Sequence, residues 1–292
     1  MKIKSFNNYS WPNIYYKSLP QNWKIEAAKL ANLIRELFDL DTDPISIKFL
    51  MQLSTAANFN IKLIKYTYEN QIYDGWIYPL ENQRFQINIR STTANKSAAN
   101  LLDYEKLNIK LEPWQWFRIM HEIAHIFFYD RRFNIPKHSN FDCNEENFCD
   151  VFASHMLIPQ TIIKNTQLTC SNLLAISKKF SSSLPTTALR FSSLYTKHYI
   201  LLFTQNTSNK STEESLVSEW CINKEDYFNH PNQPFTLSLG SVMTKDVTNK
   251  LINLKNIALN INKVNELYNI SLLKILGKNK YIATAIANEQ QV

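Results

Sequence analysis

The sequence WQWFRIMHEIAHIFFY at residues 114–129 contains a His-Glu-Ile-Ala-His string that runs from His121 to His125. A helix turns about 100° per residue, so two histidines four residues apart lie one above the other on the same face. Both imidazoles can then reach a single tetrahedral Zn²⁺. Glu122 lies about a quarter-turn away, from where it can bond a metal-bound water as a general base without binding the metal itself. The spacing therefore predicts a zinc site on a helix.

The residues around this string favour a helix. Pro113 suits a first helical position, and the 16 residues after it contain no glycine or proline. Most of them are apolar, so we expect the helix to be buried. Burying two histidines and a glutamate is costly unless they are paired or bind a metal. A five-residue string of this kind also occurs by chance, with its histidines as ordinary core residues, so the string alone does not decide between the two interpretations.

Composition and charge limit the class of protein. A chain of 292 residues is long enough for two domains. Three glycines in the whole chain exclude Gly-rich phosphate loops and a Rossmann fingerprint, since both need several glycines. The net charge of +7 is modest and spread along the chain. It favours a solvated basic surface, with direct nucleic-acid binding allowed but not favoured.

The cysteines and the N-terminus indicate where the protein acts. The four cysteines form no CxxC pair, and we interpret them as free thiols in a reducing compartment, with Cys149 expected to pack inside a helix. The N-terminus carries no apolar signal core, and no run of 18 apolar residues exists. We therefore expect a cytoplasmic protein that does not enter a membrane.

The elements before the histidines predict an α+β domain over residues 1–165. Apolar residues at helical spacing predict helices at 23–38 and 44–57, and alternating or β-branched runs predict strands at 60–66, 76–78 and 85–90. Helices, a small antiparallel sheet and then the HExxH helix are the order used by zincin-like peptidases. We expect Phe85–Arg90 to be the edge strand beside the site, where it would bind substrate main chain by β-addition. An ordinary edge strand is an equally good interpretation.

A second helix is expected from Glu145 to Ile158, ended by Pro159. Glu146 and Asp150 share one face of it with the small Ala153, which would let the two helices approach closely. Glu146 is then a natural third zinc ligand, giving His₂Glu with an open position for water. Asp150 can bond the free nitrogen of a ligating histidine. Glu145 is the alternative ligand, but we favour a solvated acid near the helix N-terminus.

The two segments together resemble the ImmA/IrrE family of zinc metallopeptidases. In that family HExxH is followed some tens of residues later by an E-x-x-A-N/D-x-F-A-x-x-L-L-M/I-P signature, which matches Glu146 to Pro159 here. The chain departs from the signature at Cys149, where alanine is usual, and at Met156, where leucine is usual. The resemblance covers roughly residues 60–200.

The resemblance implies a cytoplasmic peptidase of bacterial, phage or mobile-element origin. Such enzymes cleave a transcriptional repressor, a helix-turn-helix protein usually encoded beside them, and so derepress a stress-response or mobile-element regulon. Carried over by position, His121, His125 and Glu146 are the zinc ligands and Glu122 is the base.

Three side chains near the site are candidates to donate a hydrogen bond to the tetrahedral oxyanion. Tyr129 would lie one turn after His125 on the same helix, His138 in the following loop, and His155 on the second helix, pointing away from Glu146. A packed tyrosine and solvated or core histidines are equally ordinary interpretations of these residues.

Two further segments follow. Residues 166–197 predict a helix-turn-helix-like pair, for docking of DNA or repressor or as a structural pair; we favour the structural pair because no arginine cluster marks a groove-reading face. Residues 198–292 predict a small α+β domain that could sense a signal, dock the substrate or simply stabilise the fold. Strands are expected at 199–203 and 216–222, and a strand or helix at 281–287.

The sequence is compatible with two functions. The first is a gluzincin-like zinc endopeptidase, which the presence of all three ligands and Glu122 favours. The second is a non-catalytic regulator that binds a protein partner or DNA and carries a structural or vestigial zinc site. The missing signal and disulfides disfavour a digestive peptidase.

Overall fold

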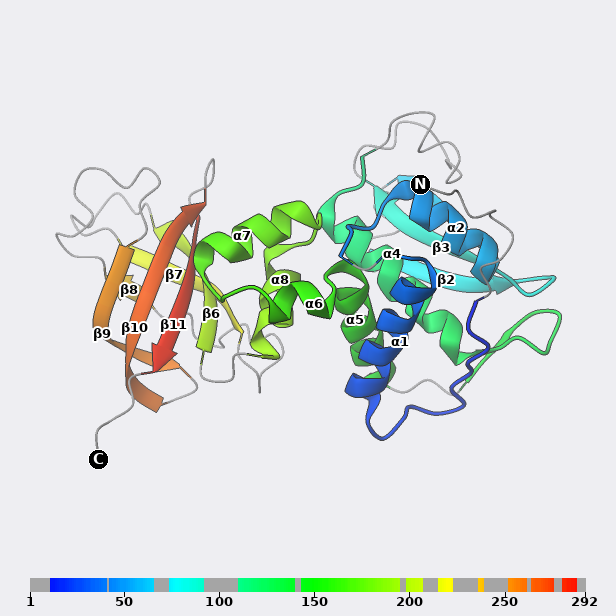
Figure 1. Cartoon of the computed structure of the whole chain (residues 1–292), viewed down its shortest axis with the longest axis horizontal. Coiled ribbons are helices and arrows are strands. Elements are labelled where there is room, and N and C mark those ends of the chain that lie inside the picture. The colour runs from blue at the N-terminus through cyan, green and yellow to red at the C-terminus, as the bar shows by residue number, and fades with distance from the viewer. Residues whose placement is uncertain are drawn as a thin grey trace. The chain divides into compact units, whose positions relative to one another are not determined.

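The structure is a computed structural model that describes residues 11–40, 42–65, 74–91, 110–139, 143–194, 198–206, 215–222, 236–238, 252–261, 264–275 and 280–287. Contacts divide the chain into two compact units (Figure 1). Unit 1 comprises Met1–Ile162 with Lys179–Ser183, and unit 2 comprises Ile163–Lys178 with Leu184–Val292. Both units mix helices and strands, which confirms the α+β class.

Unit 1 begins with the two expected helices. Helix α1 (Trp23–Leu37) buries one face, which includes Ala27, Leu30 and Ile34. Helix α2 (Ile47–Ala57) begins later than expected, because the hydroxyl of Ser46 accepts a hydrogen bond from the Phe49 amide and caps the first turn.

The sheet of unit 1 differs from the expected one. Its strands are β1 (Phe59–Lys65), β2 (Gly75–Leu80) and β3 (Arg84–Ser91), in the order β1-β3-β2. Strand β3 pairs in parallel with β1 and antiparallel with β2. The expectation of an antiparallel sheet is therefore wrong, and the sheet is mixed.

The expectation that Phe85–Arg90 forms the edge is also wrong, because β3 is the central strand. Its polar residues alternate with apolar ones, and both Gln86 and Asn88 are buried. The Gln86 amide donates to the carbonyls of Asn60 and Ile87, so hydrogen bonds within the sheet replace water. The edge strand that reaches the site is β2.

The HExxH segment forms helix α4 (Pro113–His125), with Pro113 in the first turn as expected. The Glu112 amide donates to the Gln115 side chain, so one backbone N–H at the N-terminal end of the helix has a partner. A short 3₁₀ segment, η3 (Ile126–Phe128), follows. Because α4 ends at His125, Tyr129 does not continue the helix. It lies in the two-residue strand β4 (Tyr129–Asp130), which pairs with β5 (Lys137–His138).

Helix α5 (Cys143–Leu157) includes the expected acidic segment and ends before Pro159. Helix α4 contacts β2 and β3 of the sheet and also α5, and α5 contacts α1 (Figure 1). The packed side chains between these elements are buried and mostly large: Ile119, Met120, Ile123, Phe127, Phe148 and Phe152. This packing holds α4 rigidly between the sheet and the acidic helix.

Unit 2 joins a pair of helices to a six-stranded sheet. After α6 (Gln160–Lys164), which crosses the boundary between the units, come α7 (Cys170–Lys179) and α8 (Leu184–Ser192), confirming two helices in the expected region. Helix α8 contacts two strands of the sheet. The strands are antiparallel neighbours in the order β8 (Thr236–Ser238), β7 (Ser215–Ile222), β6 (His198–Asn206), β11 (Lys280–Ala287), β10 (Val264–Ile275) and β9 (Ile252–Ile261). The strands expected at 199–203 and 216–222 are present, and residues 281–287 form a strand.

Within the described part of the chain, no helix combines the length and apolarity needed to cross a membrane.

Candidate metal centre

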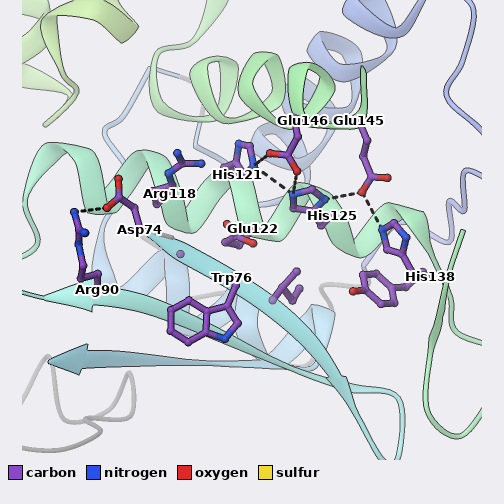
Figure 2. Close-up of a pocket in the computed structure, with 13 residues that line it drawn as sticks. Asp74, Trp76, Arg90, Arg118, His121, Glu122, His125, His138, Glu145 and Glu146 are labelled. Carbon is purple, nitrogen blue, oxygen red and sulfur yellow. Dashed lines mark hydrogen bonds and ion pairs between the residues drawn. The ribbon is translucent and has the colours of Figure 1, made fainter. Parts of the chain in front are cut away.

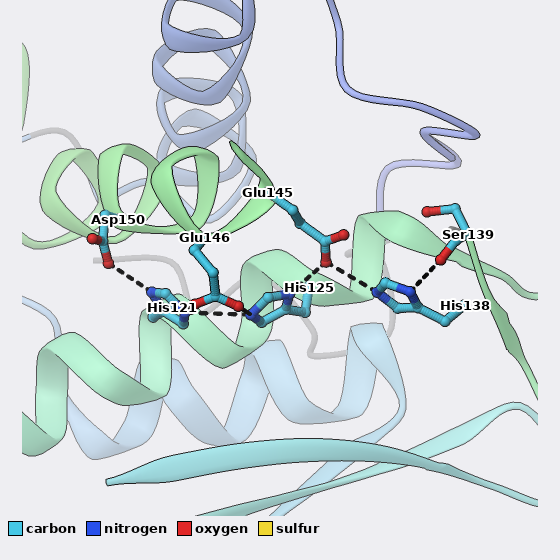
Figure 3. A network of polar contacts seen from close by, with 7 residues as sticks. All are labelled: His121, His125, His138, Ser139, Glu145, Glu146 and Asp150. Carbon is cyan, nitrogen blue, oxygen red and sulfur yellow. Dashed lines mark hydrogen bonds and ion pairs between the residues drawn. The ribbon is translucent and has the colours of Figure 1, made fainter. Parts of the chain in front are cut away.

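Three side chains from α4 and α5 meet at one point (Figure 3). The Nε2 atoms of His121 and His125 are 3.3 Å apart. One carboxylate oxygen of Glu146 lies 3.1 Å from Nε2 of His121, and the other lies 3.5 Å from Nε2 of His125. The structure thus brings together the three residues that the sequence suggested as ligands.

The opposite ring nitrogens of the two histidines are also held by carboxylates. Nδ1 of His121 lies 2.8 Å from Oδ1 of Asp150, the position that the sequence suggested for Asp150. Nδ1 of His125 lies 2.6 Å from Oε1 of Glu145. A carboxylate at Nδ1 fixes the ring and turns Nε2 toward a metal.

Glu145 is the residue for which the favoured interpretation was wrong. Its side chain is 1% exposed and not solvated, and its carboxylate accepts hydrogen bonds from His125 and from Nε2 of His138, 3.0 Å away. These two bonds lower the pKa of Glu145 against burial, which alone would raise it. Sequence reasoning missed this contact because His138 reaches the site only through the pairing of β4 with β5, whose register sets Tyr129 opposite His138.

Glu122 lines the same cleft as His121, His125 and Glu146 and lies next to the edge strand β2. Burial raises its pKa, although the neighbouring histidines act in the opposite direction. A Cβ atom added at Gly75 would lie 3.3 Å from Oε1 of Glu122 and 3.0 Å from Cδ1 of Ile89. Glycine therefore lets β2 approach the Glu122 carboxylate closely. Gly75 is one of just three glycines in the chain, but its spacing in the sequence gives no sign of this close approach.

Hydrogen bonds between the acids and the histidines shift the pKa values of both. Burial alone would lower the pKa of His121, but its bonds to Asp150 and Glu146 outweigh burial and raise that pKa to about 9. The bond from His121 lowers the pKa of Glu146 to about 2. Glu146 is therefore a carboxylate at neutral pH, the form that binds a metal.

The donor atoms present fit a metal such as zinc, and two sets of them share the same histidines. One set is His121, His125 and Glu146, whose side chain is 47% exposed and open to solvent. The other replaces Glu146 with Cys149, whose Sγ lies within 4.8 Å of both histidine donor atoms. Cys149 is fully buried, and burial raises the pKa of its thiol well above the ordinary value. A catalytic metal needs a position open to substrate, which the Glu146 set offers and the buried thiol does not.

Both histidines line a cleft of about 810 Å³, whose lining residues are drawn in Figure 2. Tyr129 lines it and packs edge-on against His138, with ring centroids 4.6 Å apart. Burial, together with the charges of Glu145 and Glu122, raises the pKa of Tyr129 to about 12, so its hydroxyl keeps its proton at neutral pH. His155 is not among the described residues that line the cleft. The lining residues are Asp74, Gly75, Trp76, Ile77, Arg90, Arg118, His121, Glu122, His125, Tyr129, His138, Glu145 and Glu146.

No protein family model matches the chain, and no curated protein matches it. The resemblance to the ImmA/IrrE family therefore rests on the motif residues in the sequences of α4 and α5.

Proposed function

We propose that the chain is a zinc-dependent endopeptidase of the zincin type, with His121, His125 and Glu146 as the metal ligands. The observation that carries the proposal is the meeting of both Nε2 atoms with the Glu146 carboxylate in the lining of the cleft. A cluster with this composition and an open side is the donor set of catalytic zinc sites with His₂Glu ligation.

Glu122 is the proposed general base. When bound here, Zn²⁺ would supply Lewis acidity, lowering the pKa of a coordinated water and polarising the scissile carbonyl. Glu122 takes a proton from the attacking water and passes it to the leaving amine. Its carboxylate is buried and faces β2, so the proposed proton transfer would occur between the proposed metal ligands and the strand that borders the cleft.

Tyr129 is the proposed donor to the oxyanion. It lines the same cleft as the ligands, and its hydroxyl remains protonated at neutral pH. A neutral hydroxyl can donate a hydrogen bond to the negative oxygen that develops during peptide hydrolysis. His138 lies against the Tyr129 ring and orients it.

Strand β2 is the proposed docking edge for the substrate main chain. It pairs with β3 on one side only among the described strands, and Gly75, Trp76 and Ile77 border the cleft. An extended peptide that adds to this free edge would present its backbone across Glu122.

The proposed substrate is a helix-turn-helix repressor whose cleavage derepresses a stress-response or mobile-element regulon. The signature of α5 supports this choice. Phe152 and Ala153 are fully buried, so the resemblance extends to residues that set the packing of the acidic helix. The test is to incubate the zinc-loaded chain with a helix-turn-helix protein encoded beside it. Cleavage by the wild-type chain and not by a Glu122→Gln variant that still binds zinc would support the proposal, and equal behaviour of the two would refute it.

The second candidate is a non-catalytic regulator with a structural metal site, which binds a protein partner or DNA. The observation that favours it is the buried Cys149 beside the two histidines. In that case zinc would be lost from a Cys149→Ala variant and Glu122→Gln would leave regulation intact.

A further inference from the structure

Arg118 lies on α4 three residues before His121, on the same side of the helix, and lines the cleft. Figure 2 places it between His121 and the pair formed by Asp74 and Arg90. Neither the function proposed above nor the motif uses this residue.

Among the described residues the charge of Arg118 has no ion-pair partner, although it acts from a greater distance to lower the pKa values of Glu122 and Glu146. Asp74, the acid nearest this end of the cleft in Figure 2, forms an ion pair with Arg90, and the Arg90 amide also donates to the Asp74 carbonyl, 3.0 Å away. Glu146 is held at His121 and His125. Within the described part of the chain, no acid forms an ion pair with the Arg118 guanidinium. It is therefore a cation at the cleft wall whose hydrogen-bond donors remain available to a ligand.

The position of Arg118 limits what it can touch. Arg118 precedes Glu122 by four residues on α4, a rise of about 6 Å, and an extended peptide advances about 3.3–3.6 Å per residue. A peptide whose scissile bond lies over Glu122 would thus bring a group within about two residues of that bond past Arg118. A guanidinium binds a carboxylate with two parallel hydrogen bonds, a geometry that an amide cannot match.

We propose that Arg118 is a specificity-determining residue that binds a substrate carboxylate within about two residues of the scissile bond. The inference rests on the proposed peptidase function. The carboxylate can be the side chain of an aspartate or glutamate, as in an endopeptidase, or the C-terminus of the substrate chain, which would instead make the chain a carboxypeptidase. The experiment distinguishes these two sources.

The test uses the zinc-loaded full chain and two mixtures of randomised peptides, one with free C-termini and one with amidated C-termini, with the cuts mapped by mass spectrometry. We expect acidic residues near the cut to be favoured roughly tenfold or more over their amides. If the carboxylate is a side chain, both mixtures give this preference. If it is the chain terminus, cuts cluster within two residues of free C-termini and disappear from the amidated mixture.

Arg118→Gln should abolish the preference, and Arg118→Lys should keep part of it because the charge remains. The matched control is Arg84→Gln, since Arg84 is exposed on β3, donates to the Glu81 carbonyl and does not line the cleft. Both glutamine variants should retain zinc and the wild-type melting temperature.

Two results separate the inference from the function on which it rests. Cleavage that depends on Glu122 but shows no carboxylate preference, or a preference that survives in Arg118→Gln, overturns the role of Arg118 alone. Absence of any Glu122-dependent cleavage in both mixtures overturns the peptidase function and the role of Arg118 with it.

Discussion

Oδ1 of Asp150 lies 2.8 Å from Nδ1 of His121, on the side of the imidazole opposite the Glu146 carboxylate. Glu145 holds His125 in the same way, 2.6 Å from its Nδ1. Helix α5 therefore contributes acids of two kinds to α4. Glu146 faces both Nε2 atoms. Asp150 and Glu145 each bond to an Nδ1 atom, on the opposite side of the ring. This arrangement orients both imidazoles before a metal arrives.

The first prediction concerns Asp150. Asp150→Asn should weaken zinc binding by roughly 10–100-fold, because the ring of His121 loses its charged partner and part of its basicity. Affinity is measured by competition with a coloured chelator. Asn147→Ala, an exposed position on the same helix, is the control and should bind zinc like the wild-type chain. Equal affinity in the two variants would contradict the role of Asp150.

The second prediction ranks the candidate ligands. Glu146→Gln should lose most of the bound zinc. Glu145→Gln should lose less, because it removes a carboxylate that bonds to Nδ1 of His125 and not to the metal. Cys149→Ala should keep the metal. Truncating the fully buried Cys149 should still lower the free energy of unfolding by about 1 kcal/mol through the small cavity it leaves. Metal content after dialysis decides the order. Greater loss from Cys149→Ala than from Glu146→Gln would assign the metal to the buried donor set.

The parts of the site that the sequence could predict are those set by local spacing. His121 and His125 share a face because helical geometry puts them there, and Glu146 and Asp150 follow the same rule on α5. Each helix also carries a local end signal, Pro113 or Pro159.

The missed features depend on contacts between distant segments. The central place of β3 follows from its parallel pairing with β1, which the alternation of its residues does not encode. The burial of Glu145 depends on His138, which is brought back to the site by a two-residue pairing after η3. The role of Gly75 depends on how closely β2 passes over Glu122. Periodicity describes one element at a time, so it predicted the candidate ligands and Asp150 but missed the roles of Glu145, His138 and Gly75, which depend on contacts between elements.

The third prediction tests that close approach. Gly75→Ala should retain zinc and reduce cleavage, because the new methyl group would meet the Ile89 side chain and press on the Glu122 carboxylate. Overpacking of this kind costs about 1–3 kcal/mol in stability. The control is Tyr78→Ala, since Tyr78 is exposed and points to the opposite face of β2. Wild-type turnover in Gly75→Ala would show that β2 can move away from Glu122 without consequence.

The fourth prediction concerns the contact between α1 and α5. The buried guanidinium of Arg35 donates to the carbonyls of Met156, Leu40 and Asp43. Arg35→Met should lower the free energy of unfolding by about 2–4 kcal/mol, because these carbonyls lose charged donors. Urea unfolding measures the change.

Lys29→Met on the same helix is the control for Arg35. Its ion pair with Glu26 is exposed, so its loss should change stability by less than about 1 kcal/mol. Similar effects of the two variants would mean that Arg35 does not hold α1 to the end of α5.

The fifth prediction is a pH dependence of the chelator-treated chain. The pKa of His121 is raised to about 9 by Asp150 and Glu146, against the effect of burial. A raised histidine pKa stabilises the folded state fully below the unfolded value of about 6.5, and this contribution is lost as the pH rises through about 9. The chelator-treated chain should therefore lose stability between these two values, by about 3 kcal/mol as an upper bound. Urea unfolding at several pH values measures the loss.

Asp150→Asn isolates the contribution of His121. The pKa of His138 is raised mainly by its bond to Glu145 and acts in the same direction, but it is common to both chains. The difference in stability between the wild-type chain and the variant should thus shrink as the pH rises from 6 to about 9. With zinc bound, the difference in stability between the two chains should no longer change over this pH range, because a ligating imidazole is neutral throughout. A difference that stays constant over this range would mean that Asp150 supports His121 by packing and not by charge.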